Sequence, residues 1–109
     1  PDKEDRKDKV VNGAFIEYTY PVSPIPIEII PIAMRKAAQR GITAEQVIEA
    51  VQNPEQKIPG YGDRTVYQRR VRLPGNKEQL LRVICEESQG KRVVVTAYLT
   101  SDIARYWRH

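Results

Sequence analysis

Arginine and hydroxyl side chains alternate with apolar residues in two neighbouring stretches near the C-terminus. Arg82 lies in LLRVICEE, and Thr96 and Tyr98 lie two residues apart in RVVVTAYLT. Because alternate residues of a β-strand point to the same face of a sheet, we expect these three side chains to share one face. A guanidinium stays charged and can bind two phosphate oxygens at once, and a tyrosine hydroxyl beside it can bind phosphate or transfer a proton. The three residues are therefore candidates for a phosphate-binding site.

Cleavage of RNA without a metal ion requires three chemical functions. A base takes the proton of the ribose 2′-hydroxyl, cations stabilise the phosphorane, and an acid protonates the departing 5′-oxygen. Either Arg69 or Arg70 could join Arg82 in supplying the cations, and His109 is the only side chain expected to titrate near neutral pH. Each arginine could instead simply solvate a sheet face, and His109 is the last residue, where fraying is expected. The predicted catalytic residues are Arg82, Thr96, Tyr98, Arg69, Arg70 and His109.

A second group of basic and aromatic residues could bind RNA around this centre. Tyr61 and Tyr67 could stack on splayed bases, as aromatic residues interleaved with arginine do in proteins that bind single strands. They could equally be ordinary strand residues, and Tyr98 could be a half-buried core tyrosine. The predicted RNA-binding residues are Arg35, Lys36, Tyr61, Arg64, Tyr67, Arg72 and Arg92.

Charge is unevenly distributed along the 109 residues. The chain has 18 basic and 14 acidic residues, which give a net charge of +4, and residues 61–109 carry ten basic residues against five acidic ones. Clustered Lys and Arg displace counterions from phosphates, so we expect nucleic acid rather than a membrane as the partner. One cysteine excludes an internal disulfide and one histidine leaves no set of zinc ligands, so no metal or other cofactor is expected. No apolar run approaches the roughly 20 residues of a membrane anchor.

The segments that precede the first predicted helix differ in composition. Residues 1–13 are dense in charge and short of large apolar groups, which is typical of a flexible tail. Residues 14–20 alternate and are rich in β-formers, which predicts a strand. Four prolines make residues 21–31 an extended connector along the domain surface, because proline is incompatible with a helix interior and with a central strand. We expect residues 14–109 to form a single domain.

Two short helices are expected after the connector. Residues 32–40 are rich in helix formers and are followed by Gly41, a residue common just beyond helix C-termini. Thr43, with Gln46 three residues later, is a capping-box signature for the start of a second helix, which ends before Pro54. The pair would form an αα-hairpin that needs a sheet to cover its apolar faces. The apolar face of the second helix consists of Val47, Ile48 and Val51.

Three antiparallel strands and a closing helix follow. The strands are TVYQRRVRL, LLRVICEE and RVVVTAYLT, joined by two tight turns, and the loop before them could include a short strand near residues 57–59. Residues 101–102 can cap a closing helix in which Ile103 and Trp107 pack down. Strict alternation places Leu81, Val83, Cys85, Val93, Val95, Ala97 and Leu99 on the core face, and Arg82, Thr96 and Tyr98 on the face that the helices leave open.

The run RGITAEQVIEAVQNPEQKIPGYGDRTVYQRRV, followed by LLRVICEE and VVVTAYLTSDIARYW, resembles a bacterial domain family of unassigned function. That family is grouped with the RelE/ParE toxin superfamily and its BrnT-like relatives. Its members carry an Arg-Gly-Ile/Val helix joint, an Asn-Pro after the second helix, a Leu-Arg-Val strand, and a Val-Thr-X-Tyr-X-Thr strand near a closing Tyr-Trp. The resemblance covers about residues 33–107. It implies a RelE/ParE-like α+β fold of strand, helix, helix, three antiparallel strands and helix, with the helical hairpin packed on one face of the sheet.

The resemblance also implies a function. It indicates a toxin domain that acts as a metal-independent endoribonuclease on tRNA, mRNA or rRNA and leaves a 2′,3′-cyclic phosphate. The implied partners are this RNA and an acidic antitoxin or immunity protein, and the implied place of action is the bacterial cytoplasm. Because the sequence begins with Pro, a domain delivered as the C-terminal part of a larger secreted protein is also considered.

One position departs from the family pattern. Relatives open the first helix with a His-Ala pair eight positions ahead of the Arg of Arg-Gly-Ile, whereas this chain has Ile32 and Ala33. If that histidine transfers protons in relatives, this chain uses another residue or is inactive. Two alternatives therefore stay open: a catalytically inactive module that binds RNA or a protein, and a ParE-like topoisomerase inhibitor that acts through its helical hairpin.

Overall fold

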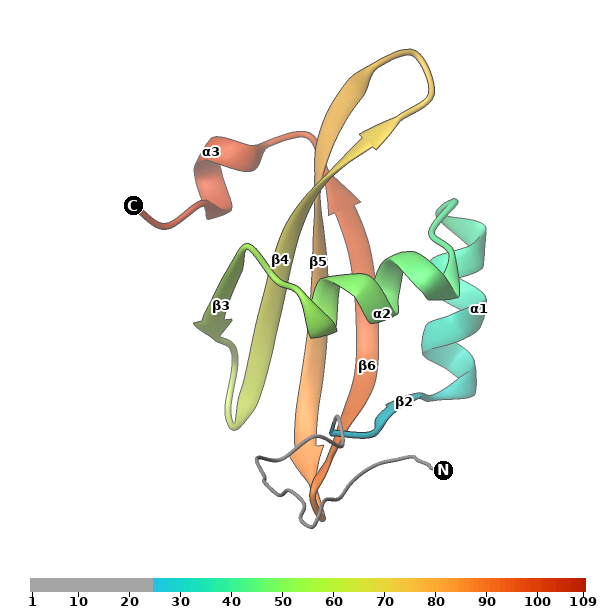
Figure 1. The fold of residues 1–109 in the computed structure, drawn as a ribbon, viewed down its shortest axis with the longest axis vertical. Helices are drawn as coiled ribbons and strands as arrows, with labels where there is room; N and C mark the ends of the chain where they lie inside the picture. Colours follow the sequence, from blue (N-terminus) through green and yellow to red (C-terminus); the bar gives the residue numbers. More distant parts are fainter. Residues whose placement is uncertain (1–24) are drawn as a thin grey trace, which may run out of the picture.

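A five-stranded mixed sheet and three helices make up the part of the chain that the computed structural model describes, residues 25–109. This confirms the α+β class, and Figure 1 shows the sheet in the order β2-β6-β5-β4-β3. The predicted tail, the predicted strand at 14–20 and the start of the connector lie outside the described residues. The elements are β2 (Ile27–Ile29), α1 (Pro31–Gln39), α2 (Ala44–Gln52), β3 (Gln56–Pro59), β4 (Arg64–Leu73), β5 (Lys77–Ser88), β6 (Lys91–Thr100) and α3 (Ile103–Tyr106).

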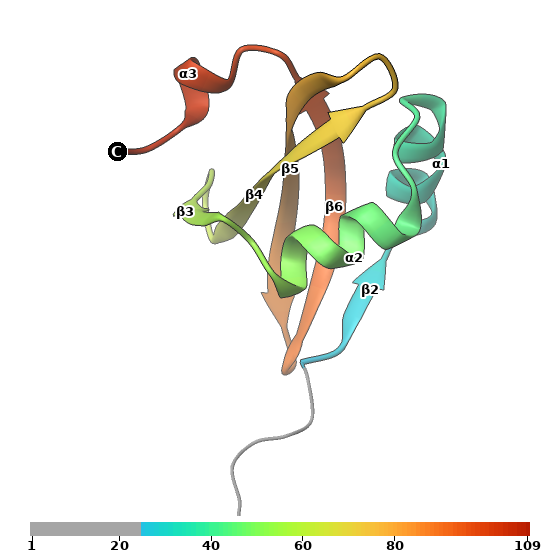
Figure 2. The same cartoon turned by 45° about the horizontal axis from the view of Figure 1, so that its top comes forward.

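The proline-rich connector contains an edge strand, which the sequence reading did not predict. Residues Ile27–Ile29 pair in parallel with β6 at the edge of the sheet, next to α1 (Figure 2). The flanking prolines fit this position, because Pro26 uses only its carbonyl, which accepts from Arg92 N at 2.9 Å, and Pro31 opens α1, where no backbone donor is needed. The expectation that these residues lie only on the surface is wrong, since Ile27 and Ile29 pack against the core.

Helix α1 is displaced by one residue from the predicted range 32–40, and α2 begins directly after Thr43 as predicted. The backbone N–H of Ile42 donates to the carbonyl of Ala37 at 2.8 Å, and Gly41 has a φ of 76°, which closes α1 with a Schellman motif. Thr43 Oγ1 accepts from Gln46 N at 3.1 Å and the Gln46 side chain accepts from Thr43 N at 3.0 Å, which completes the predicted capping box. The buried face of α2 differs from the prediction by one residue: it consists of Val47, Ala50 and Val51.

Strands β4, β5 and β6 form the predicted antiparallel meander, with β3 added beside β4. The alternation fails at one place in β6. Ile84 pairs with Thr96 but Cys85 pairs with Val94, so Val95 is the extra residue of a β-bulge. The prediction of Val93 and Val95 as core residues is therefore wrong: Val94 is fully buried, and both of its neighbours are partly exposed.

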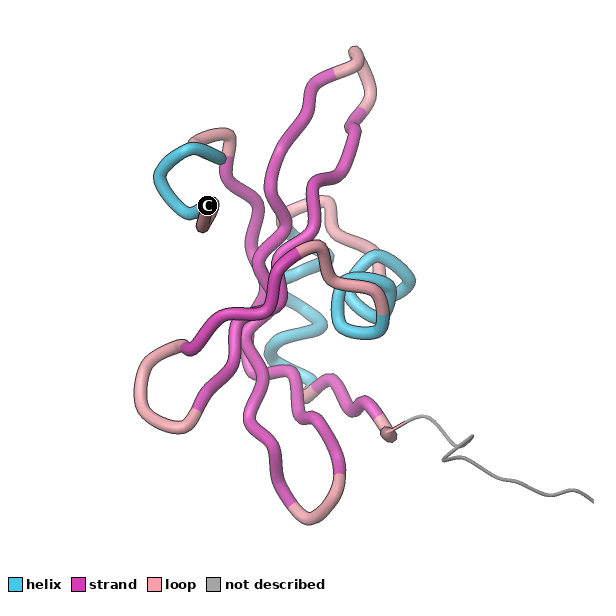
Figure 3. Tube along the Cα trace, turned by 60° about the vertical axis from the view of Figure 1, so that its left-hand side comes forward, coloured by secondary structure: helices cyan, strands magenta, loops and turns pink. Residues whose placement is uncertain are grey.

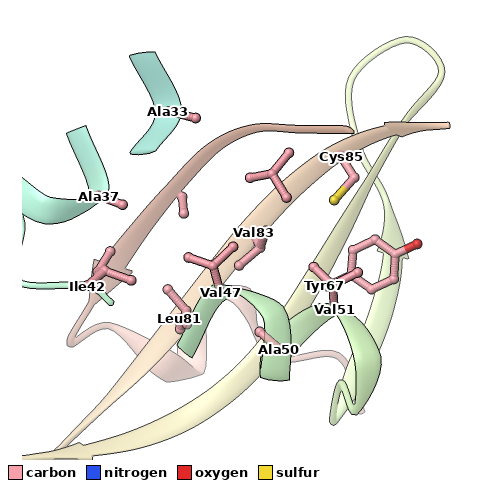
Figure 4. Close-up of a cluster of buried hydrophobic side chains, with 12 residues drawn as sticks. Ala33, Ala37, Ile42, Val47, Ala50, Val51, Tyr67, Leu81, Val83 and Cys85 are labelled. Atoms are coloured by element: carbon pink, nitrogen blue, oxygen red, sulfur yellow. The ribbon is translucent and has the colours of Figure 1, made fainter. Parts of the chain in front are cut away.

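The two faces of the sheet are covered by different elements. Helices α1 and α2 lie on one face, and the C-terminal segment, Ile103–His109, lies on the other side of the strands (Figure 3). The main core lies under α1 and α2, where Tyr67, Val83 and Cys85 meet residues of both helices (Figure 4). A smaller set of buried residues lies on the opposite face, outside that core: Ile58, Val66, Gln68 and Leu80.

The closing helix is shorter than expected. Asp102 precedes α3 but makes no side-chain cap; its backbone N–H instead donates to Thr100 Oγ1 at 3.1 Å. Trp107 follows the helix in an extended conformation and so lies outside it. The C-terminal segment is thus one turn of helix and an extended tail rather than a helix that packs through Ile103 and Trp107.

Candidate functional site

Arg82 lies at the centre of three adjacent strands and is held by neutral groups. In register, Gln68 of β4 and Tyr98 of β6 flank it on either side. Arg82 Nε donates to Gln68 Oε1 at 2.6 Å, and Nη1 donates to Tyr98 Oη at 2.5 Å. The guanidinium also stacks on the ring of Tyr106, with its Cζ 4.1 Å from the ring centroid. These contacts fix both the position and the plane of the cation.

The group formed by Arg82 and Tyr98 keeps unused hydrogen-bonding capacity. Within residues 25–109, no carboxylate lies within 4.0 Å of Arg82, and its Nη2 has no partner. Nη2 is not among the buried unpartnered atoms of this part of the chain, so it reaches solvent. Tyr98 Oη accepts from Arg82, which leaves the phenol proton for another acceptor. A cation with a free N–H beside a free O–H is suited to the oxygens of a phosphodiester.

Gln68 is a member of this site that the sequence reading missed. Its side chain is fully buried, and its Nε2 donates to Gln56 Oε1 at 3.0 Å and to the carbonyl of Tyr106 at 3.2 Å. With both amide hydrogens used, its oxygen is turned toward Arg82. One sequence signal could have found it, because a glutamine two residues before Arg70 shares that strand face and is uncharged.

The face that carries Arg82 is not open, because the C-terminal segment covers part of it. Gln56 receives a bond from Arg108 N at 3.0 Å, and its own Nε2 donates to the Arg108 carbonyl. The Arg70 guanidinium lies over the Trp107 ring at 4.7 Å. The alternation of apolar residues in the strands does not predict this contact, because it is made by the C-terminal segment, which follows the last strand.

The structure resolves the choice between Arg69 and Arg70 by position. Arg70 lies on the Arg82 face, where Nε and Nη2 bind the two carboxylate oxygens of Glu55 at 3.1 and 3.0 Å. These hydrogen bonds hold the pKa of Glu55 below its ordinary value and raise the pKa of Arg70. Arg69 lies on the helix face, where it donates to the Asn53 carbonyl at 2.7 Å, so it is not a neighbour of Arg82.

Two further predicted RNA-binding residues lie on the helix face. Tyr67 is buried under α2 and donates to Glu87 at 3.0 Å, so it cannot stack on a base. Burial and this hydrogen bond raise the pKa of Tyr67 to about 12. Arg92 lies beside the same pair, with its Nε 3.4 Å from Glu87 and its guanidinium over the Tyr67 ring. Burial also raises the pKa of the Cys85 thiol to about 12, which agrees with its predicted role as a small core residue.

The other predicted residues are spread over the surface. Thr96 shares the Arg82 face and is partly exposed, two residues from Tyr98. Tyr61 is 96% exposed in the loop between β3 and β4, and His109 is exposed at the chain end.

Exposed residues of α1 include Arg35 and Lys36, on the helix side. Exposed ion pairs engage Arg64 with Glu86 and Arg72 with Glu78, and these arginines share the Arg82 face.

Residues 25–109 contain neither a cluster of metal ligands nor a membrane-spanning helix. Among residues 25–109, no group of three or more His, Cys, Asp or Glu side chains could hold a metal ion. In the same part of the chain, no helix is long and apolar enough to cross a membrane. The arrangement that remains is a fixed cation with a neighbouring phenol, which can bind an anion and donate a proton to it.

A protein-family model matches more than half of the chain. The family model described as "Domain of unknown function (DUF4258)" matches residues 33–99. This range begins within α1 and includes α2 and the strand residues of the Arg82 site, but not the C-terminal segment. No curated protein and no solved structure matches the chain.

Proposed function

The chain belongs to the DUF4258 family, whose description assigns no activity, and we propose from the Arg82 site that it is a toxin domain that binds RNA and cleaves it without a metal ion. The observation that supports this is the Arg82–Tyr98 pair, in which neutral partners hold the cation and leave Arg82 Nη2 and the Tyr98 phenol proton without a partner among residues 25–109. The helical layer on one face of an antiparallel meander is compatible with the RelE/ParE-like fold that the sequence resemblance implies, and we extend the proposal to that fold.

In the proposed reaction, Arg82 Nη2 binds a non-bridging oxygen of the scissile phosphate and stabilises the negative charge of the phosphorane. The ribose 2′-oxygen attacks phosphorus and the bond from phosphorus to the 5′-oxygen breaks. Tyr98 gives its phenol proton to the departing 5′-oxygen. The products are a 2′,3′-cyclic phosphate and a 5′-hydroxyl. His109 is the proposed acceptor of the 2′-hydroxyl proton, since it is the only histidine of the chain.

A second candidate function is RNA binding without turnover. It is favoured by the surroundings of Arg82, whose hydrogen-bond partners within residues 25–109 are an amide and a phenol, neither of which is a base at neutral pH. Under this proposal the same two groups bind backbone phosphates. Either function would be neutralised by an acidic antitoxin or immunity protein that covers the basic Arg82 face.

The test is to incubate the 109-residue protein with total RNA or tRNA in EDTA and to compare it with Arg82→Met. The control is Lys77→Met, which removes one positive charge from an exposed position at the start of β5. Cleavage by the wild type and the control, but not by Arg82→Met, supports the nuclease. Salt-dependent binding that only Arg82→Met weakens, without cleavage, supports the second candidate. Equal behaviour of all three proteins contradicts both.

A further inference from the structure

Two glutamines hold the end of the chain against the sheet. Gln56 and Gln68 are register partners in β3 and β4, and Gln68 donates to Gln56 at 3.0 Å. Gln56 exchanges two hydrogen bonds with the backbone of Arg108, as a neighbouring strand would, and Gln68 donates to the carbonyl of Tyr106. The backbone of the C-terminal segment is therefore held at two alternate residues, Tyr106 and Arg108.

The same hydrogen bonds reach Arg82. Because both amide hydrogens of Gln68 are used by Gln56 and Tyr106, its carbonyl oxygen can only face Arg82 Nε, 2.6 Å away. Tyr106, held by Gln68 through its carbonyl, stacks its ring on the Arg82 guanidinium at 4.1 Å. The C-terminal segment therefore acts on Arg82 in two ways. The Tyr106 carbonyl orients the Gln68 amide, and the Tyr106 ring stacks on the guanidinium.

We propose that Gln68 is a positioning residue for Arg82 and that the C-terminal segment completes the phosphate-binding site rather than blocking it. The proposal rests on the proposed RNA-binding function. Its physical basis is that Arg82 Nη2, which has no partner within residues 25–109, stays in solvent while Tyr106 occupies one face of the guanidinium, so the C-terminal segment fixes the cation without using Nη2. A preorganised cation binds phosphate more tightly than a mobile one, because no side-chain entropy is lost on binding.

The first experiment tests the positioning without RNA. In proton–nitrogen NMR spectra of the full chain, the Nε–Hε signal of Arg82 is expected to be shifted by the Tyr106 ring and slow to exchange. Gln68→Met removes the acceptor while keeping a similar shape, so the signal should move to the position of solvated arginines. Tyr106→Leu should move the Arg82 Nε–Hε signal by less than Gln68→Met does. Gln52→Met is the matched control, since Gln52 is exposed at the end of α2. An unchanged Arg82 signal in Gln68→Met overturns the positioning role.

The second experiment measures binding of a fluorescent oligouridine of about 12 nucleotides over a range of salt concentrations. Gln68 carries no charge, so a merely structural role would leave the salt dependence unchanged. If Gln68 positions Arg82 on a phosphate, Gln68→Met should weaken binding about tenfold and reduce the slope of log affinity against log salt by about 0.7, as for Arg82→Met. Thermal melting of each variant identifies any loss that comes from unfolding.

The outcomes separate this proposal from the proposed function. No binding of the oligouridine by the wild type contradicts the RNA function, whereas the NMR result still decides whether Gln68 positions Arg82. Tighter binding by Tyr106→Leu than by the wild type would show that the tail blocks the site, and it would overturn the second half of the proposal. Weaker binding by both Gln68→Met and Tyr106→Leu, with Gln52→Met unchanged, supports it.

Discussion

Arg82 differs from other arginines of the sheet in the kind of partner that holds it. Arg64, Arg70 and Arg72 share its face, and each has a carboxylate within 4.0 Å. An arginine paired with a carboxylate must give up that pair to bind phosphate, and an exposed pair of this kind contributes little to stability. The Arg82 guanidinium is held by an amide and a phenol, so its charge stays available to an external anion.

Ile32 stands where the sequence resemblance implies a first-helix histidine, and its location leads to a prediction about catalysis. It is 46% exposed on α1, which packs on the face opposite Arg82. We therefore expect Ile32→His to change neither RNA binding nor cleavage, because a histidine there cannot reach a phosphate bound to Arg82. Cleavage assays in EDTA check this, with Ile32→Gln as the control for polarity. Cleavage gained by the histidine variant alone would place the reactive centre on the helix side.

Tyr67 is expected to make the folded protein less stable at alkaline pH. Its folded-state pKa of about 12 lies above the ordinary value of 10.0, chiefly because it is buried. The fold thus favours the neutral phenol, and this contribution to the free energy of unfolding is fully present below pH 10 and is lost as pH rises toward 12. We expect Tyr67→Phe to lose about 1 kcal/mol at pH 8 with the hydrogen bond to Glu87, and to lose less stability than the wild type between pH 10 and 12.

Urea unfolding at pH 8, 10 and 11 measures this difference. Tyr61→Phe is the matched control, because Tyr61 is exposed in a loop and its removal should leave the pH dependence as in the wild type. If the Tyr67→Phe curve falls as steeply with pH as the wild-type curve, Tyr67 is not the group responsible.

The extra residue in strand β6 changes which of its side chains face the core. The bulge between the pairs Ile84–Thr96 and Cys85–Val94 turns Val94 into the core while Tyr98 keeps its place beside Arg82. Without the bulge, strict alternation from Ala97 would bury Val93 and Val95 instead. The bulge therefore lets Val94 and Ala97 both face the core while Tyr98 faces the site.

Substitution of the neighbouring valines checks the bulge. Val94→Ala should reduce the free energy of unfolding by about 2 kcal/mol, since Val94 is fully buried and its loss leaves a cavity in the main core. Val95→Ala removes the same two methyl groups from a partly exposed position and should cost less than about 1 kcal/mol. Chemical denaturation of both variants measures the difference, and a larger loss in Val95→Ala would contradict the observed register.

The two faces of the sheet are packed by elements of unequal size. Helices α1 and α2 cover the main core, and the seven-residue C-terminal segment lies on the other face, where it contacts the buried Gln68. Hydrogen bonds and a stacking contact join the segment to β3, β4 and β5. The stability of this face and the geometry of the Arg82 site are therefore linked.

Leu80 provides a test of that link. It is fully buried on the Arg82 face, so Leu80→Ala should cost about 2–5 kcal/mol. It should also loosen the C-terminal segment, which would make Trp107, the only tryptophan, more accessible to acrylamide in fluorescence quenching. Leu73→Ala, at the partly exposed end of β4, is the control. A Leu80→Ala protein as stable as the control would mean that this face is not packed.

Local signals in the sequence determined much of the fold. The Thr43 capping box, the glycine that ends α1 and the three-strand meander all follow from interactions between residues close in the chain. The same alternation placed Arg82 and Tyr98 on one face, because their strands are regular at those positions. Arg69 and Arg70 could not be separated by sequence, since both strand faces there mix polar and apolar residues.

Only the tertiary structure decided what surrounds Arg82. Gln68 and Tyr106 are 38 residues apart and Gln56 and Arg108 are 52 residues apart, so no local pattern predicts that they bond. The bulge at Val95 depends on how β6 pairs with β5, which composition does not encode. The sequence by itself determined that a cation and a phenol share a face; the long-range register and the return of the chain end decided that this cation is held by Gln68 and Tyr106. Such contacts form only once the sheet exists, because their stability depends on its packing.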